Sequence, residues 1–158
     1  MAFRELLEGA SVVDDCLSVK FSILEKSIAT GNAPMVFSNL EESPGHRAAI
    51  NILTRQRLCE YFGVAPGELI DILAWAMENP SEPVIVPKEE SPVMDNTMEG
   101  VDLGRLPIPW HYPEDAGRYQ SASIIIAEYG GERNSSFHRQ LLKDNGRTAT
   151  RLVPRHLR

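Results

Sequence analysis

The 158-residue sequence has little cysteine and no long apolar run. Its two cysteines, Cys16 and Cys59, are far apart and form no CxxC pair, which argues against a secreted disulfide scaffold and a zinc ribbon. No apolar stretch approaches the roughly 18 residues that a membrane span needs. Charges at Arg4 and Glu5 stand where a secretory signal needs an apolar segment. These absences favour a cytoplasmic chain with reduced thiols and no membrane span.

Common catalytic signatures are also missing. The sequence contains no dinucleotide-binding G-x-G-x-x-G, no P-loop, no G-x-S-x-G and no H-E-x-x-H motif. No two of its histidines are spaced for one face of a predicted helix, which excludes a helix-borne metal pair; they are His46, His111, His138 and His156. We expect the first two to be ordinary loop residues, in a Pro-Gly turn and a proline-rich connector.

The composition is that of an ordinary globular domain. Hydrophobic residues make up 42% of the chain and charged residues 24%, which excludes disordered, collagen-like and coiled-coil classes. The length suits one domain, or one small domain with part of another.

The net charge of −6 hides an uneven distribution. Residues 1–131 carry 9 Lys and Arg against 20 Asp and Glu, whereas residues 132–158 carry 7 against 2. The basic segment is either a solvated tail or a local anion site, and it does not indicate binding to nucleic acid. Six of its seven cations are Arg, whose planar guanidinium suits carboxylate or phosphate, and this favours the anion site.

The first 80 residues predict a small α/β unit. Two apolar runs, Met35–Leu40 and Arg47–Leu53, are joined by a Pro-Gly turn and predict a hairpin. Helical spacing and end signals predict four helices, over Phe3–Glu8, from a Ser18 N-cap to about Thr30, from a Thr54 cap to Phe62, and over Glu68–Met77. In the last helix, six apolar side chains are predicted to be buried: Leu69, Ile70, Ile72, Leu73, Ala76 and Met77.

From Pro80 onward the character changes, because eight of the eleven prolines lie there. Val84–Val86 and Val93–Met98 are predicted as short strands, and Val101–Gly117 as an extended connector, since repeated proline excludes long helices and central strands. Three strands with tight glycine turns follow, at Gln120–Tyr129, Ser135–Leu142 and Thr148–Val153. The sequence therefore predicts an α+β fold whose second part is an antiparallel β region that has only begun.

Polar residues of this β region form a partial metal-ligand pattern. Arg139 and His156 fall on adjacent predicted strands, with Asn134 at the start of the first. An Asn oxygen and a His nitrogen could be two ligands of a metal, and at least one carboxylate is missing. Because side chains alternate along a strand, His138 and Arg139 are expected on opposite faces.

Two segments resemble the UbiD family of reversible decarboxylases, which use prenylated FMN: Arg133-Asn134-Ser135-Ser136-Phe137-His138-Arg139 and Arg151-Leu152-Val153-Pro154-Arg155-His156. The resemblance extends upstream to the family's N-terminal domain at Ala33–Leu40 and Ala48–Leu53, to its linker at Val101–Pro109, and to the entry of its cofactor domain at Asp115–Tyr119. It implies a small N-terminal α/β domain at 1–90, a proline-rich linker with short strands at 91–119, and at 120–158 the incomplete start of an antiparallel split β-barrel that binds flavin.

The resemblance also implies roles for single residues. Asn134 and His156 match the residues that hold a divalent metal, usually Mn²⁺, near the cofactor phosphate; K⁺ is a further ion it allows. Arg139 matches the arginine that binds the substrate carboxylate and pairs with a catalytic glutamate. The implied contacts to prenylated FMN are Ser136, Phe137, Arg139, Arg151, Leu152, Val153 and Arg155.

The implied activity is that of a non-oxidative carboxy-lyase acting on an α,β-unsaturated or aromatic carboxylic acid. The Arg-rich end favours the archaeal branch of the family, whose substrate is a phosphorylated anhydromevalonate in isoprenoid biosynthesis. Two alternatives stay open. One is the polyprenyl-hydroxybenzoate branch of quinone biosynthesis, and the other is a non-catalytic module that binds a flavin nucleotide or another anion.

The departure from the family pattern lies in length. The glutamates that complete the metal site and supply acid–base chemistry in the family have no counterpart in these 158 residues. We therefore expect the isolated chain to be inactive and to need a C-terminal half or a complementary subunit. The complete protein is expected to be a homo-oligomer.

Overall fold

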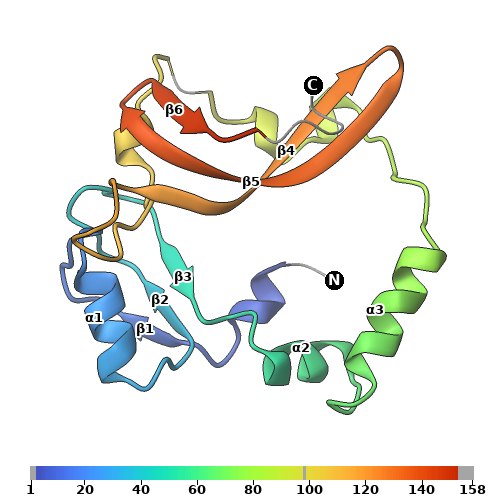
Figure 1. Cartoon of the computed structure of the whole chain (residues 1–158), viewed down its shortest axis with the longest axis horizontal. Helices are drawn as coiled ribbons and strands as arrows, with labels where there is room; N and C mark the ends of the chain where they lie inside the picture. Colours follow the sequence, from blue (N-terminus) through green and yellow to red (C-terminus); the bar gives the residue numbers. More distant parts are fainter. Residues whose placement is uncertain (1–2, 98, 153–158) are drawn as a thin grey trace.

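The computed structural model describes residues 3–97 and 99–152. It contains helices and two separate three-stranded sheets, with the strand orders β1-β2-β3 (the first sheet) and β4-β5-β6 (the second sheet). Figure 1 shows α1 against the first sheet, the second sheet beyond it, and α3 standing apart from both. The predicted α+β class is confirmed, and the second sheet is open rather than a closed barrel in this part of the chain.

The first sheet contains the predicted hairpin and one strand that the sequence did not indicate. β2 (Met35–Phe37) and β3 (Ala48–Ile50) pair antiparallel, as predicted from the Pro-Gly turn between them. β1 (Ser11–Val13) adds to β2 in parallel. A three-residue parallel strand depends on a partner distant in sequence, and its local pattern is too short to predict it.

The core of this unit lies between the first sheet and α1 (Ser22–Ala29). Phe37 is fully buried, and the apolar side chains around it come from the strands, from α1 and from the segments next to them: Val13, Val19, Ile23, Met35 and Leu40. Burial of these side chains supplies the main stabilising term of the unit.

The helix ends agree only partly with the predicted ones. The first segment is a 3-10 helix, Phe3–Leu7. The predicted Ser18 N-cap is wrong: α1 starts after Phe21, which has φ 71°, and the Ser18 hydroxyl instead donates to the Glu42 carboxylate. The predicted α2 (Arg55–Phe62) is confirmed, because the Thr54 side chain accepts from the Arg57 N–H at its start and Gly63 closes it.

Burial of α3 (Leu69–Glu78) was predicted wrongly. Of its apolar side chains only Leu69 is buried, whereas Ile70 is 64% exposed and Met77 84% exposed. The helix packs beside α2, but no further element of the described residues covers it. A helix apolar on most of its circumference is normally buried against another surface.

The proline-rich segment contains turns in place of the two predicted strands. Val84–Val86 has no regular structure, and a 3-10 helix, Pro92–Met94, occupies most of the second predicted strand, whose last residue lies outside the described ones. Further 3-10 turns lie at Lys88–Glu90 and Leu103–Arg105. Val and Ile favour strands only where a neighbouring strand accepts their hydrogen bonds, and the prolines remove donors. The predicted connector after residue 100 contains no long helix or strand, as expected, but it is bent instead of extended, with the last of these turns and a further turn at residues 113–117. No helix in the described residues is long and apolar enough to cross a membrane.

The connector is hydrogen-bonded to the segment before α1 and to the second sheet. The Trp110 N–H donates to the Val19 carbonyl at 2.9 Å, and the Phe21 N–H donates to the Trp110 carbonyl at 2.8 Å. The Phe21 and Trp110 rings pack with centroids 5.5 Å apart. At the other end, the Leu142 N–H donates to the Arg118 carbonyl at 2.9 Å. These bonds fix the second sheet relative to the first.

Arg118 holds the connector in its turned shape. Its half-buried guanidinium donates to the carbonyls of Gly104, Leu106 and Ile108, at N···O distances of 3.0, 2.5 and 2.8 Å. Burial lowers the pKa of Arg118, and the nearby Glu42 carboxylate partly offsets this.

Arg118→Ala is expected to lower the free energy of unfolding by about 3 kcal/mol, because three carbonyls lose a charged donor. Urea denaturation measures the change. Arg105→Ala, at an exposed arginine of the same connector, is the matched control and should change it by less than about 0.5 kcal/mol. Equal losses in both variants would show that the three hydrogen bonds do not stabilise the fold.

Glu42 joins the segment before α1 to the turn after β2. Its carboxylate accepts from the Ser18 hydroxyl and, at 2.8 Å, from the Val19 N–H. Burial alone would raise the pKa of Glu42, but these hydrogen bonds, its own main-chain N–H and the Arg118 charge outweigh burial and hold the pKa below 4.5.

The depressed pKa of Glu42 gives a pH dependence of stability. The stabilisation is present above the unfolded-state pKa, near 4.5, and is lost as the pH falls through the lower folded-state pKa. The thermal midpoint of Glu42→Gln should therefore lie below that of wild type at neutral pH, and the gap should shrink below pH 4.5. Thermal unfolding of both proteins across this range is the measurement, and a gap that does not change with pH contradicts the assignment.

Candidate functional site

The candidate site lies on a long antiparallel hairpin formed by β4 (Tyr119–Tyr129) and β5 (Glu132–Asp144). Gly130 and Gly131 turn it with φ of 61° and 85°, a region that glycine occupies without strain. The hairpin and its turn are as the sequence predicts. β6 (Arg147–Thr150) ends earlier than predicted. Arg151 and Leu152, which the prediction included in this strand, are exposed and lie outside the sheet.

One edge of β5 is partly open. β6 pairs with the Gln140–Asp144 end only, so residues 132–139 have β4 on one side and no strand on the other among the described residues. In Figure 1 this part of the hairpin projects beyond β6. An unpaired strand edge presents free main-chain N–H and C=O groups.

One face of β5 carries Asn134, Ser136 and His138, all half-buried. The Ser136 Oγ lies 2.9 Å from the His138 Nε2. The His138 Nδ1 lies 3.4 Å from the main-chain carbonyl oxygen of Arg151. This face therefore connects β5 to the segment that follows β6.

The opposite face carries Phe137 and Arg139, both exposed. The guanidinium carbon of Arg139 lies 5.2 Å from the centre of the Tyr119 ring, a cation–π contact. Phe137 is 75% exposed and is paired in register with Ile124, which is 60% exposed. An arginine over an aromatic ring thus borders an open apolar surface.

The predicted site residues are divided between these two faces. The opposite orientation of His138 and Arg139 is as the sequence predicts. The same alternation separates Ser136 from Phe137 and Arg139, although all three are implied flavin contacts, and it puts Asn134, the implied metal ligand, on the face of Ser136. Both faces border the open edge of β5. The three remaining predicted residues, Val153, Arg155 and His156, lie outside the described part of the chain.

Comparison with known proteins places this region in a family. Residues 84–158 match the family model described as UbiD, 3-octaprenyl-4-hydroxybenzoate carboxy-lyase Rift-related domain. A relative from Methanothermobacter thermautotrophicus, named anhydromevalonate phosphate decarboxylase, is 32% identical over 153 residues, which are 95% of this chain and 35% of the relative. A Methanosarcina mazei protein of the same name is 35% identical over 122 residues, 77% of this chain and 28% of that protein. The chain belongs to the UbiD family.

A solved UbiD-class structure has the same arrangement of elements. The enzyme HmfF from Pelotomaculum thermopropionicum, in complex with prFMN, superposes with a TM-score of 0.85 and 29% identity. The match covers 98% of this chain and 39% of that enzyme. The chain thus spans about a third of the length of the UbiD-family proteins it matches.

The side chains along β5 are of the chemical types that bind a flavin nucleotide. The amide of Asn134 and the hydroxyl of Ser136 can donate to or accept from a ligand hydroxyl, and the guanidinium of Arg139 can donate to phosphate or carboxylate oxygens. For a metal the fit is partial. The described residues contain no group of three or more His, Cys, Asp or Glu that could hold one. Asn134 by itself offers one neutral oxygen to a metal.

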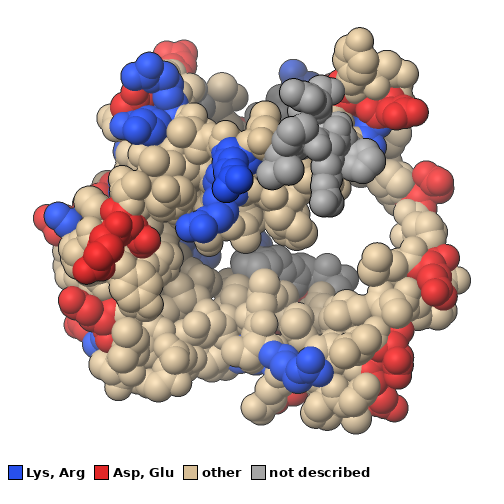
Figure 2. Space-filling view, in the orientation of Figure 1, with Lys and Arg blue, Asp and Glu red and all other residues tan. Residues whose placement is uncertain are grey.

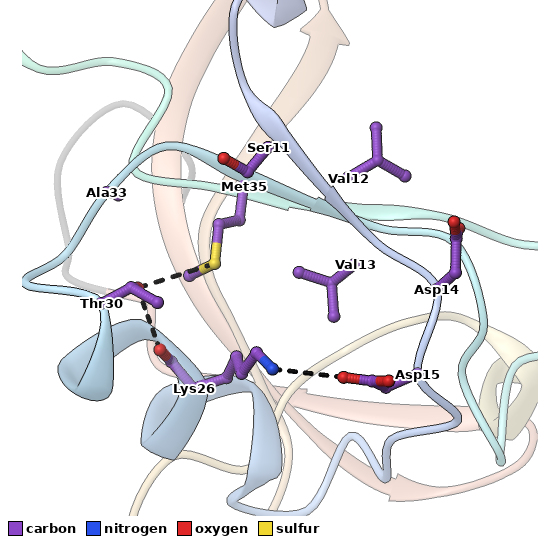
Figure 3. Close-up of a pocket in the computed structure, with 9 residues that line it drawn as sticks. All are labelled: Ser11, Val12, Val13, Asp14, Asp15, Lys26, Thr30, Ala33 and Met35. Carbon is purple, nitrogen blue, oxygen red and sulfur yellow. Dashed lines mark hydrogen bonds and ion pairs between the residues drawn. The ribbon is translucent and has the colours of Figure 1, made fainter.

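A separate hollow of about 480 Å³ lies between β1 and α1, far in sequence from the UbiD-matched segment (Figure 3). Its floor is apolar, with Val13 and Met35, and an exposed Lys26–Asp15 ion pair of 3.2 Å lies at its rim. Lys26 and Asp15 neutralise each other, the Asp14 carboxylate accepts from the Ser38 hydroxyl, and none of the lining residues was predicted for the site. We assign it no role.

Two features of the site were missed by sequence reasoning. The position of Tyr119 under Arg139 depends on a register shift between Gln120 and Ser123 that no sequence pattern indicates. The Ser136–His138 contact could have been found, because residues two apart on a strand share a face.

Proposed function

We propose that this chain supplies the strand against which prenylated FMN binds in a UbiD-type, non-oxidative carboxy-lyase. The completed enzyme is this chain together with the polypeptide that makes up the remaining length of its relatives. It decarboxylates an α,β-unsaturated or aromatic carboxylic acid. The observation that carries the proposal is the open edge of β5, along which Asn134, Ser136 and Arg139 lie within the UbiD-matched segment. The prFMN bound to HmfF supports a flavin.

The flavin lies along that open edge. Ser136 and Arg139 point to opposite faces, so a ligand can touch both only by approaching from the edge of the strand. The unpaired main-chain groups of residues 132–139 add hydrogen-bonding partners there. Arg151 and Leu152 lie close by, because the Arg151 carbonyl is next to His138.

Arg139 holds the substrate carboxylate. A guanidinium binds a carboxylate through two parallel hydrogen bonds, which orient the carbon–carbon bond that is to break. The Tyr119 ring fixes the guanidinium plane, and among the described residues no carboxylate forms an ion pair with Arg139. Prenylated FMN, when bound, supplies the acceptor for the electron pair of that bond as CO2 leaves.

Asn134 contributes one oxygen to a metal site near the cofactor phosphate, with His156 as a second ligand. We assign Mn²⁺ to this site, with K⁺ as a further ion. The carboxylate ligands and the acid–base glutamates come from the completing polypeptide. The free thiols of Cys16 and Cys59 support a reducing, cytoplasmic compartment.

A phosphorylated anhydromevalonate is the substrate we favour. The names of the two archaeal relatives support it, and so does the excess of arginine in the last 27 residues. The test is CO2 release by the completed enzyme from anhydromevalonate phosphate, from its dephosphorylated form and from a prenylated 4-hydroxybenzoate. We expect the phosphorylated acid to react at least about tenfold faster than the other two. Preference for the aromatic acid would instead assign the chain to the polyprenyl-hydroxybenzoate branch.

The completing polypeptide covers apolar surface that the chain leaves exposed. On α3, Ile70 and Trp75 are more than 60% exposed, and on the hairpin Ile124, Ile126 and Phe137 are at least 60% exposed. Figure 2 shows a gap through the molecule beside α3 and the segment that follows it. HmfF is a longer enzyme, and its TM-score of 0.85 shows that its elements are arranged as in this chain. Closer packing of α3 and the hairpin within this chain therefore does not cover the exposed apolar side chains.

The isolated chain is expected to self-associate through these surfaces. Sedimentation velocity should show species larger than a monomer whose share grows with concentration. Ile126→Lys should reduce that share, whereas Val12→Lys, at an equally exposed valine of the first sheet, should not. A monomer at every concentration contradicts the need for a covering partner.

A further inference from the structure

We infer that His138 is a positioning residue for the flavin site: it fixes the Ser136 hydroxyl so that its lone pairs face the ligand. The inference rests on the proposed function, since Ser136 and Arg151 are proposed flavin contacts. His138 has itself been given no role above. It is the described side chain that touches both of these residues.

The geometry determines which ring nitrogen carries the proton. The His138 Nδ1 faces the main-chain carbonyl of Arg151 at 3.4 Å, and a carbonyl can only accept a hydrogen bond. The proton of the neutral ring is therefore on Nδ1. The Nε2 is then an acceptor, and at 2.9 Å it takes the proton of the Ser136 hydroxyl.

This arrangement decides what Ser136 can recognise. Its only proton is used toward His138, so Ser136 presents lone pairs and accepts a hydrogen bond. The matching ligand group is a donor, such as a ribityl hydroxyl of a flavin. A phosphate oxygen, which only accepts, does not match. His138 thus orients the Ser136 hydroxyl so that it accepts a hydrogen bond from the ribityl chain of the flavin and does not bind the phosphate.

The test is a double-mutant cycle on flavin binding by the completed enzyme, with FMN and riboflavin as probes and fluorescence quenching as the readout. We expect His138→Phe and Ser136→Ala each to weaken FMN binding about three- to tenfold. The double variant should bind no more weakly than Ser136→Ala alone, because His138 acts through Ser136. The Ser136→Ala loss should be equal for FMN and riboflavin, which lacks the phosphate.

Two further variants separate positioning from general damage. His138→Gln, whose side-chain oxygen can still accept from Ser136, should bind FMN within about twofold of wild type. Ser135→Ala, an exposed neighbour on the other face, is the matched control and should not change binding. Thermal unfolding of each variant shows whether the fold is retained.

The outcomes test the role of His138 separately from the proposed function. Losses that add in the double variant, or a Ser136→Ala loss confined to FMN, overturn the role of His138 while the proposed function stands. If wild type binds neither FMN nor riboflavin, the proposed function fails and this inference fails with it.

Discussion

Arg139→Ala in the completed enzyme should reduce kcat/KM for decarboxylation about a thousandfold while flavin affinity changes less than about threefold. The loss is large because a buried carboxylate deprived of its bidentate cation costs about 3–5 kcal/mol. The flavin is held by other groups along the β5 edge. Steady-state CO2 release and flavin absorbance, measured on the same preparations, separate the two effects.

Arg133→Ala is the matched control for this variant. Arg133 lies on the same strand and is also exposed, but it is paired with Glu128 at 2.9 Å instead of facing a ligand. Its removal should leave kcat/KM within about twofold, as expected for an exposed ion pair. Tyr119→Leu should cost about threefold, because the cation–π contact only orients the guanidinium. Near wild-type turnover of Arg139→Ala refutes the carboxylate role and favours a non-catalytic module.

Asn134→Ala should lower both metal content and flavin occupancy of the completed enzyme about 10–100-fold. This range is typical when an outer-sphere partner of a metal is lost, and loss of a direct ligand is at least as severe. His156→Ala should behave in the same way if the two residues share one metal. Metal analysis beside flavin absorbance measures both quantities.

Ser135→Ala is again the control, since Ser135 neighbours Asn134 on the opposite face. It should retain full metal and flavin. If Asn134→Ala also retains both, Asn134 is not a ligand, and its half-buried amide has only a structural role in the hairpin. Loss of flavin with full metal content would place Asn134 against the flavin itself.

The second sheet was predictable because its signals are local. The β-branched run Ile124–Ile126 and the Gly130-Gly131 turn indicate the hairpin without distant partners. The wrong predictions concern segments whose structure or burial depends on residues far away in the sequence. Val84–Val86 has strand-forming residues but no neighbouring strand, and α3 has an apolar face whose partner is outside the described residues.

The sequence selects candidate residues for the site but does not predict their arrangement. The family resemblance selected Asn134, Ser136 and Arg139 by their spacing, and spacing alone already sends the last to the opposite face from the others. The position of Tyr119 beside Arg139 required the actual pairing of β4 with β5, including its register shift. The tautomer of His138 required the Arg151 carbonyl, whose position depends on where β6 ends.

The most direct test of the central claim is a reconstitution assay with prenylated FMN, Mn²⁺ and an unsaturated carboxylic acid. CO2 release is measured for this chain, for the C-terminal portion of the Methanothermobacter thermautotrophicus relative, and for both together. The account predicts that a bound flavin spectrum and CO2 release appear only when both are present, because this chain supplies the proposed flavin-contacting strand and the remaining length of its relatives supplies the proposed acid–base groups. Turnover by this chain alone, or a folded complex of the two that binds no flavin, would contradict it.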